Sequence, residues 1–192
     1  MKKIVYVIAL TLITISCKAQ SNIINIVNRC NNNYSNTNGT TYLKDVDNLY
    51  APFIGTWKWI DGNRELVLTL IKQTKYHYNQ GNSNYYEDRI VGYYVYKENG
   101  TTLINTSNDN LTVEFPKICL DFDCYSQLVI INFADILKNK DYDGWIELIS
   151  SNSIKFHFKE DTHIPIQKEG SPTLPPVYLG TSFPLDIVLA KQ

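Results

Sequence analysis

The most informative segment for the fold class is Phe53-Ile54-Gly55-Thr56-Trp57-Lys58-Trp59-Ile60-Asp61-Gly62, because bulky apolar residues alternate along it and a turn signal ends it. Every second residue from Phe53 to Trp59 falls on one face of an extended strand. Asp61-Gly62 is a strong hairpin signal, because glycine accepts the positive φ that tight hairpin turns require. The alternating leucines of residues 66–70 give the returning strand one apolar face. This stretch therefore predicts a β-hairpin that covers a core.

The pattern of short strands and turn signals continues to the C-terminus. Asn99-Gly100 and Asp143-Gly144 are further turn signals. The unbroken apolar run Leu128–Phe133 predicts a strand buried on both faces, and Gly92 marks a bulge or a sharp bend. The other predicted strands cover residues 75–78, 85–96, 101–106, 111–115, 145–149, 154–158 and 185–189. Short strands at this spacing predict an all-β, antiparallel domain over residues 50–192, either barrel-like or a sandwich.

The first residues have the pattern of a bacterial secretory leader. A basic start, Met1-Lys2-Lys3, precedes an apolar run from Ile4 to Ile15 that is too short to remain as a spanning helix. Thr14-Ile15-Ser16-Cys17 is similar to a lipobox, although Thr14 stands where Leu is usual. Cleavage would then remove residues 1–16 and leave a lipid on the sulfur of Cys17.

An alternative cleavage removes the lipid anchor. Cys17 and Ala19 also form a small-x-small site, and cleavage after Ala19 or Gln20 would release a soluble periplasmic or secreted protein. In the lipoprotein reading, several acyl chains hold the protein on a membrane. Lys18 follows the cysteine, which favours the outer membrane by analogy with other bacterial lipoproteins, facing the periplasm or the cell surface. Residues 17–49, rich in Asn, Ser and Thr, are expected to form a flexible tether.

The composition excludes a nucleic-acid-binding role. The chain has 18 basic and 19 acidic residues, and loss of Lys2 and Lys3 with the leader leaves 16 basic residues and a net charge of about −3. Nucleic-acid binding would need a basic excess on one face. The 14 Tyr, 3 Trp and 7 Phe residues favour strands. Tyrosine also suits binding surfaces, but we interpret the Tyr-rich residues 85–96 mainly as sheet.

Three cysteines remain beyond Cys17. An exported protein meets an oxidising environment, so a disulfide is expected. A Cys119–Cys124 bond would close a small loop and leave Cys30 over, whereas Cys30 could instead pair with either of them. None of the three histidines is near a cysteine in the sequence, so neither a metal site nor another cofactor is expected.

The segment Phe53-Ile54-Gly55-Thr56-Trp57-Lys58 resembles the opening strand of lipocalins and fatty-acid-binding proteins. The resemblance implies that Gly55 and Trp57 pack at the closed floor of a barrel. The whole chain also resembles a family of small, uncharacterised exported proteins of Gram-negative bacteria, and this resemblance implies an envelope β-domain without naming an activity. The residues that carry it are Ser16–Gln20, Gly55–Trp59, Tyr85–Asp88, Gly92–Tyr94, Ile104–Thr106 and Ile187–Gln192.

Acidic residues form two candidate groups. Asp121 and Asp123 are two residues apart, so on a strand they would share a face, as paired carboxylates for acid–base chemistry do. We prefer the alternative that they decorate an exposed loop closed by Cys119 and Cys124. We interpret Glu87-Asp88-Arg89 as ordinary charge at a strand edge.

Two further sequence patterns, at residues 139–144 and at His157, do not indicate a metal site or a catalytic site. Residues 139–144 mimic the first half of a calcium loop, but Ser150 stands at the position of the bidentate glutamate, so a polar turn is predicted. His157 alternates with Phe156 and Phe158 and is expected on the exposed face. A Gly-x-Ser-x-Gly elbow is missing from the sequence. No catalytic residue is therefore proposed from the sequence.

Three classes of function remain. The first is a non-catalytic binding module for a small apolar or amphipathic ligand, which predicts an apolar cavity behind Trp57. The second is a structural or protein-interaction lipoprotein, which predicts a filled core and an exposed aromatic patch. The third, with least support, is an enzyme with convergent, perturbed ionisable groups in a pocket. The expected partners are the membrane, through Cys17, and a small ligand or an envelope protein.

Overall fold

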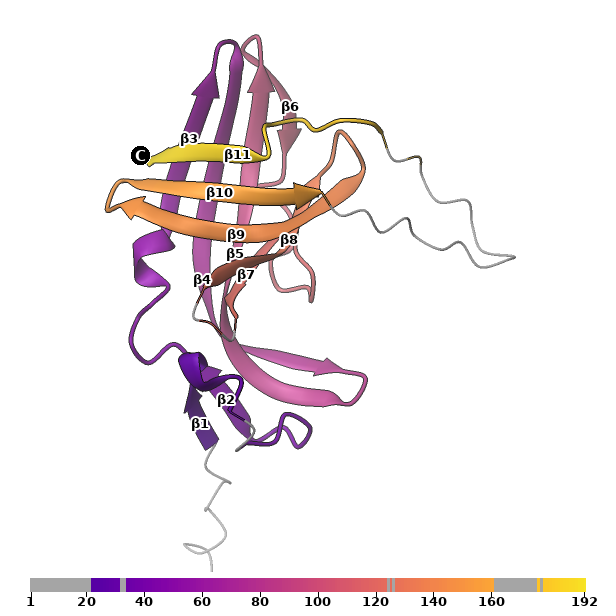
Figure 1. Cartoon of the computed structure of the whole chain (residues 1–192). Coiled ribbons are helices and arrows are strands. Elements are labelled where there is room, and N and C mark those ends of the chain that lie inside the picture. The colour runs from indigo at the N-terminus through magenta and orange to yellow at the C-terminus, as the bar shows by residue number, and fades with distance from the viewer. Residues whose placement is uncertain (1–21, 32–33, 124, 126, 161–175, 177) are drawn as a thin grey trace, which may run out of the picture.

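The computed structural model of the protein is a closed β-barrel with extra strands at one end (Figure 1). It describes residues 22–31, 34–123, 125, 127–160, 176 and 178–192. The predicted leader, the lipidation residue Cys17, Cys124 and most of the Pro-rich stretch 163–180 lie outside these ranges. Within the described part of the chain, no helix has the length and apolar character needed to cross a membrane.

Eight antiparallel strands form the barrel, which confirms the all-β prediction and decides for a barrel over a sandwich. Each strand pairs with the next along the chain, and the last pairs with the first. β6 (Thr101–Asn105) is an extra strand beside the third one. The barrel strands are β3 (Gly55–Asp61), β4 (Arg64–Gln80), β5 (Ser83–Glu98), β7 (Ile118–Phe122), β8 (Leu128–Asp135), β9 (Lys140–Ser150), β10 (Ser153–Glu160) and β11 (Asp186–Lys191).

Large side chains pack the interior of the barrel. Trp57 is fully buried, and its indole N–H donates to the carbonyl of Phe53 at 2.8 Å, at the end of the 3₁₀ turn η2 (Ala51–Phe53). Phe133 contacts the rings of Tyr94, Phe156, Phe158 and Phe183, with centroids 4.8–6.1 Å away. An eight-stranded barrel is just wide enough for side chains to fill it, and here aromatic rings do so.

Two strand predictions differ from the structure. The runs at residues 66–70 and 75–78 belong to one long strand, β4, which is irregular between Gln73 and Tyr76. Residues 111–115 are turns, not a strand. The physical reason is that the guanidinium of Arg89 donates hydrogen bonds to the backbone carbonyls of Val113 and Glu114, each at 2.7 Å. These carbonyls therefore bond to a side chain and not to a neighbouring strand.

Two finer predictions were also wrong. β8 is not buried on both faces, because Ile131 is 46% exposed on the outside of the barrel. Of the two alternatives given for Gly92, a bulge or a sharp bend, the bulge is wrong, since the pairing of β5 with β4 runs through it without a shift. A side chain there would place its Cβ only 2.5 Å from the carbonyl oxygen of Thr69. Glycine is needed at this position because two strands approach closely.

The described part of the Asn-rich segment is folded, unlike the tether predicted for residues 17–49. β1 (Asn22–Asn25) pairs in parallel with β2 (Thr41–Lys44), and β2 pairs in parallel with β5. The turn η1 (Ile26–Asn28) places Ile26 in the core. The asparagines provide turn bonds, as in the Asn84 amide that donates to the Asn36 carbonyl at 2.7 Å. These strands lie beside the end of the β4–β5 hairpin that contains its turn, below the barrel in Figure 1.

Candidate functional site

The candidate site lies where β5 changes its pairing partner. β5 pairs with β7 from Gly92 to Ile90, and with β2 at Glu87 and Tyr86. A pocket of about 170 Å³ lies beside this divergence, and we call it the fork pocket. Its charged lining residues are Arg29, Glu87, Arg89, Glu114 and Asp121. Its other lining residues are Tyr78, Tyr85, Phe115, Cys119 and Ile131.

Arg29 joins the N-terminal segment to two carboxylates of the barrel. Its Nη2 donates to Glu87 Oε2 at 3.0 Å and forms an ion pair with Asp121 Oδ2. The Arg29 side chain is 21% exposed, whereas those of Glu87 and Asp121 are almost completely buried. One partly exposed guanidinium therefore pairs with two carboxylates that water hardly reaches.

Burial disfavours the ionised forms of Glu87 and Asp121. Burial, together with the negative charge of Asp121, raises the pKa of Glu87 to about 7, while Arg29, Arg89 and a hydrogen bond from Tyr85 oppose the rise. Burial likewise raises the pKa of Asp121, against the opposing effects of Arg29 and Tyr50. Glu87 therefore titrates near neutral pH.

Tyr50 connects the fork pocket to the barrel core. Its hydroxyl donates to Asp121 Oδ1 at 2.6 Å, and its ring stacks on Phe122 with centroids 5.1 Å apart. Burial and the charge of Asp121 raise the pKa of Tyr50, so it stays a neutral donor. Asp121 is thus held from two sides, by Tyr50 and by Arg29.

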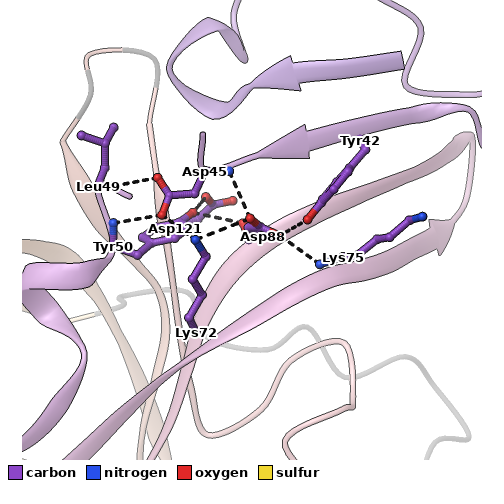
Figure 2. A network of polar contacts seen from close by, with 8 residues as sticks. All are labelled: Tyr42, Asp45, Leu49, Tyr50, Lys72, Lys75, Asp88 and Asp121. Atoms are coloured by element: carbon purple, nitrogen blue, oxygen red, sulfur yellow. Dashed lines mark hydrogen bonds and ion pairs between the residues drawn. The ribbon is translucent and has the colours of Figure 1, made fainter. Parts of the chain in front are cut away.

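Asp88 organises a second buried network, which Figure 2 shows. Its Oδ1 accepts hydrogen bonds from the Tyr42 hydroxyl at 2.5 Å and from the Lys75 amide at 3.0 Å. Its Oδ2 accepts one from the Asp45 amide at 3.1 Å. A single carboxylate on β5 therefore fixes β2 and the irregular part of β4.

Asp45 extends this network to the entry of the barrel (Figure 2). It accepts the backbone amides of Leu49 and Tyr50 at 2.7 and 3.2 Å, and Lys72 Nζ lies 2.8 Å from its Oδ2. The carboxylates of Asp45 and Asp88 together accept four backbone amides, so their oxygens are already engaged within the protein. This network is a support for the site and not the site itself.

Arg89 forms one wall of the pocket. Its Nε donates to Gln73 Oε1, and its two terminal nitrogens donate to the carbonyls of Val113 and Glu114, all at 2.7 Å. Its guanidinium carbon lies 3.4 Å from the centre of the Tyr76 ring. Arg89 thus holds the turn at residues 111–115 against β5. Each of its three guanidinium nitrogens donates a hydrogen bond to the protein.

The mouth of the pocket is aromatic and apolar. Tyr78 and Tyr85 stack across the β4–β5 hairpin, with ring centroids 5.2 Å apart. Phe115 is 57% exposed, and the exposed Ile131 completes this rim. Buried charges and exposed apolar side chains therefore meet in one small space.

The cysteines differ from the predicted arrangement. Cys119 is a free, buried thiol on β7, so the predicted Cys119–Cys124 bond does not form. Cys119 lies between Ile118 and Leu120 in the barrel wall, and burial raises its pKa to about 12. Cys30 is disulfide-bonded, and its partner lies outside the described residues.

The other candidate residues take structural roles. Asp123 Oδ1 accepts the amides of Tyr125 and Gln127, each at 2.8 Å, so it caps a turn and does not pair with Asp121. His157 lies on the outer face, as predicted, with Nδ1 2.7 Å from Asp186 Oδ1. The calcium-like residues 139–144 form a turn and the start of β9. Among the described residues, no three His, Cys, Asp or Glu side chains are arranged to hold a metal ion.

The sequence interpretation missed the most informative residues. Glu87, Asp88 and Arg89 are all buried, not charge at a strand edge. The signal available was their position, since three charged residues in a row interrupt a strand otherwise rich in Tyr, Val and Ile. Charged residues are almost never fully buried unless they are paired, but the partner Arg29 lies 58 residues away and no local pattern reveals it.

Comparison with known proteins places the chain in a family but not in a functional class. The model of a family described as "Family of unknown function (DUF6705)" matches residues 1–192. No curated protein and no solved structure matches the chain. The resemblances to lipocalins and to exported proteins of Gram-negative bacteria stay predictions. The match over the full sequence shows that the chain belongs to DUF6705, a family of unknown function.

Proposed function

We propose that this protein is an exported envelope lipoprotein, anchored through Cys17, whose barrel is a non-catalytic binding module for a small amphipathic ligand. The observation that carries the binding proposal is the fork pocket, where buried charges lie beside an exposed apolar rim. A concave site that combines apolar walls with a few convergent polar groups is the usual form of a ligand site.

The fork pocket suits a ligand better than the barrel interior does. We expected an apolar cavity behind Trp57, but Trp57 is fully buried within a continuous cluster of packed side chains. The rings around Phe133 fill the same interior. A ligand would have to displace these rings, whereas the fork pocket already has open volume.

Binding is a better proposal than catalysis for these carboxylates. A pKa near 7 would suit Glu87 as a general acid. However, Arg29 contacts both Glu87 and Asp121. A proton donor already held by a guanidinium is poorly placed to protonate a substrate, so we assign these groups to recognition.

Export is supported by the leader pattern and by the cysteine chemistry. Residues 1–16 have the basic start and apolar run of a lipoprotein leader. The disulfide at Cys30 is a bond typical of oxidising compartments. Changing Cys17→Ser and fractionating cells tests the anchor: the parent protein should sediment with outer membranes and the variant should not. Equal distribution of both would favour the soluble periplasmic or secreted alternative.

Native mass spectrometry tests the binding role. The full chain, purified gently from its own cells, should carry a reproducible added mass that disappears on denaturation. Phe115→Ser should lose that mass, because it removes the apolar side chain from the rim of the pocket without adding a charge. Leu103→Ser, on β6, is the control and should keep it, since Leu103 is similarly exposed but does not line the pocket. A bare mass in all three proteins would count against the proposal.

A second candidate is a protein-interaction lipoprotein. Ile136, Leu137, Tyr178 and Leu179 are exposed, and Leu179 is 93% exposed. The amide of Tyr178 donates to the carbonyl of Lys138 at 2.9 Å, which brings these residues together beside the β8–β9 turn. Exposed apolar groups of this kind favour partner contacts. Crosslinking in cells, compared between the parent and Leu179→Asp, tests this candidate.

A further inference from the structure

We propose that the fork pocket binds a small organic cation, with an ammonium group at the buried carboxylates and a hydrocarbon part on Phe115 and Ile131. This inference rests on the proposed binding role of the pocket and adds the chemical class of the ligand. Its basis is the charge, the unused acceptor and the aromatic lining of the same space.

The charge in the pocket favours a cation. Three carboxylates line it, those of Glu87, Glu114 and Asp121, against the two guanidinium groups of Arg29 and Arg89. With all five groups ionised, the lining has an excess negative charge, and an ammonium group beside Glu87 would favour the ionised form of this residue, whose pKa burial raises to about 7. An added anion would increase that excess in a poorly hydrated space, whereas an added cation would remove it.

The hydrogen-bonding capacity of the lining points the same way. All three nitrogens of Arg89 already donate to protein acceptors. Nη2 of Arg29 is shared between Glu87 and Asp121. Two buried atoms of the lining have no hydrogen-bond partner among the described residues: the donor Nε of Arg29 and the acceptor Oε1 of Glu114. An ammonium group carries three donors and no acceptor, so it would supply a donor for Glu114 beside the carboxylates of Glu87 and Asp121.

The aromatic lining and the size narrow the class further. Tyr78 and Tyr85 line the pocket as a stacked pair, and aromatic faces attract ammonium groups. The volume of about 170 Å³ is below the roughly 300–1,000 Å³ of pockets for drug-sized ligands. Phe115 and Ile131 lie at the rim and offer apolar contact to a short chain. A short alkylammonium has the charge, size and apolar part that these features select.

Isothermal titration calorimetry with three probes of equal length tests this assignment. Hexylammonium, hexanol and hexanoate are titrated into the full chain in a non-ionic detergent at pH 7.5. Charge-assisted hydrogen bonds lead us to expect hexylammonium to bind roughly tenfold to hundredfold more tightly than hexanoate. Glu87→Gln and Glu114→Gln should each weaken hexylammonium binding about tenfold or more. Glu65→Gln should not, because Glu65 lies outside the pocket between Lys58 and Lys97.

The outcomes separate this inference from the proposed function. If hexanol or hexanoate binds as tightly as hexylammonium and Phe115→Ser abolishes that binding, the pocket is a ligand site but the cation assignment is wrong. If no probe binds and the protein from its own cells carries no mass that Phe115→Ser removes, both proposals are wrong. Glu114 is only partly buried, so Glu114→Gln keeps the test valid if Glu87→Gln fails to fold. Displacement of hexylammonium by glycerophosphoethanolamine would assign the ammonium to a lipid headgroup, and no displacement would assign it to a free amine.

Discussion

Replacing Arg29 by methionine should destabilise the protein by an amount that depends on pH. The change removes the only guanidinium that contacts both Glu87 and Asp121 within the described residues. Removing one partner of a buried ion pair costs about 3–5 kcal/mol. Because the Arg29 side chain is 21% exposed, we expect the lower end, about 3 kcal/mol at pH 8.

The stability that Arg29→Met removes should be smaller at pH 5 than at pH 8. Burial raises the folded-state pKa of Glu87 to about 7, above its ordinary value of 4.5. Ionisation of Glu87 therefore lowers stability as the pH rises through this interval, and Arg29 limits that effect in the parent protein. At pH 5 Glu87 is protonated, so only Asp121 is left without its partner, and we expect a smaller loss than at pH 8.

Urea unfolding followed by tryptophan fluorescence at pH 5 and pH 8 measures both values. Arg64→Met is the matched control, because Arg64 pairs with Asp61 on an exposed hairpin and such pairs contribute about 0–1 kcal/mol. A loss of equal size at both pH values, or a loss at pH 8 no larger than that of the control, would refute the reasoning.

Three further predictions follow from the packing. Phe133→Ala should lower the free energy of unfolding by about 3–5 kcal/mol in the same urea assay, because Phe133 contacts four other aromatic rings in the core. Gly144→Ala should abolish cooperative unfolding, since its Cβ would lie 1.9 Å from the carbonyl oxygen of His157. Gly81→Ala, where the space is open, should cost only about 1 kcal/mol through its positive φ. Cys119 should not react with Ellman's reagent in the native protein and should react fully in urea, because it is a buried thiol whose pKa is raised to about 12; rapid native reaction would contradict this burial.

Local patterns were sufficient to predict most of the barrel strands. The hairpin at Asp61-Gly62 and the alternation around Phe156 both reappear in the structure, as β3–β4 and β10. These features depend on near neighbours in the sequence, where turn geometry and burial alternate within a few residues. The pairing of β11 with β3 is different, because it joins Lys191 to Trp57, and no local signal specifies it.

The candidate site depends on contacts of this long-range kind. Glu87 lies on β5 and Asp121 on β7, with β6 and a connecting segment between them, and Arg29 reaches both from a segment whose composition indicated a tether. Composition reports the many Asn, Ser and Thr residues of that segment, but not the burial of Ile26 that fixes it to the core. Whether a charge is buried is decided by the tertiary fold and not by its neighbours in sequence.

Mapping amide chemical shifts during a titration with hexylammonium tests whether the ligand site is the fork pocket, outside the barrel core. We predict that the shifts concentrate at Arg29, Glu87 and Cys119. Shifts that concentrate instead at Leu68 and Phe156, inside the barrel, would contradict it.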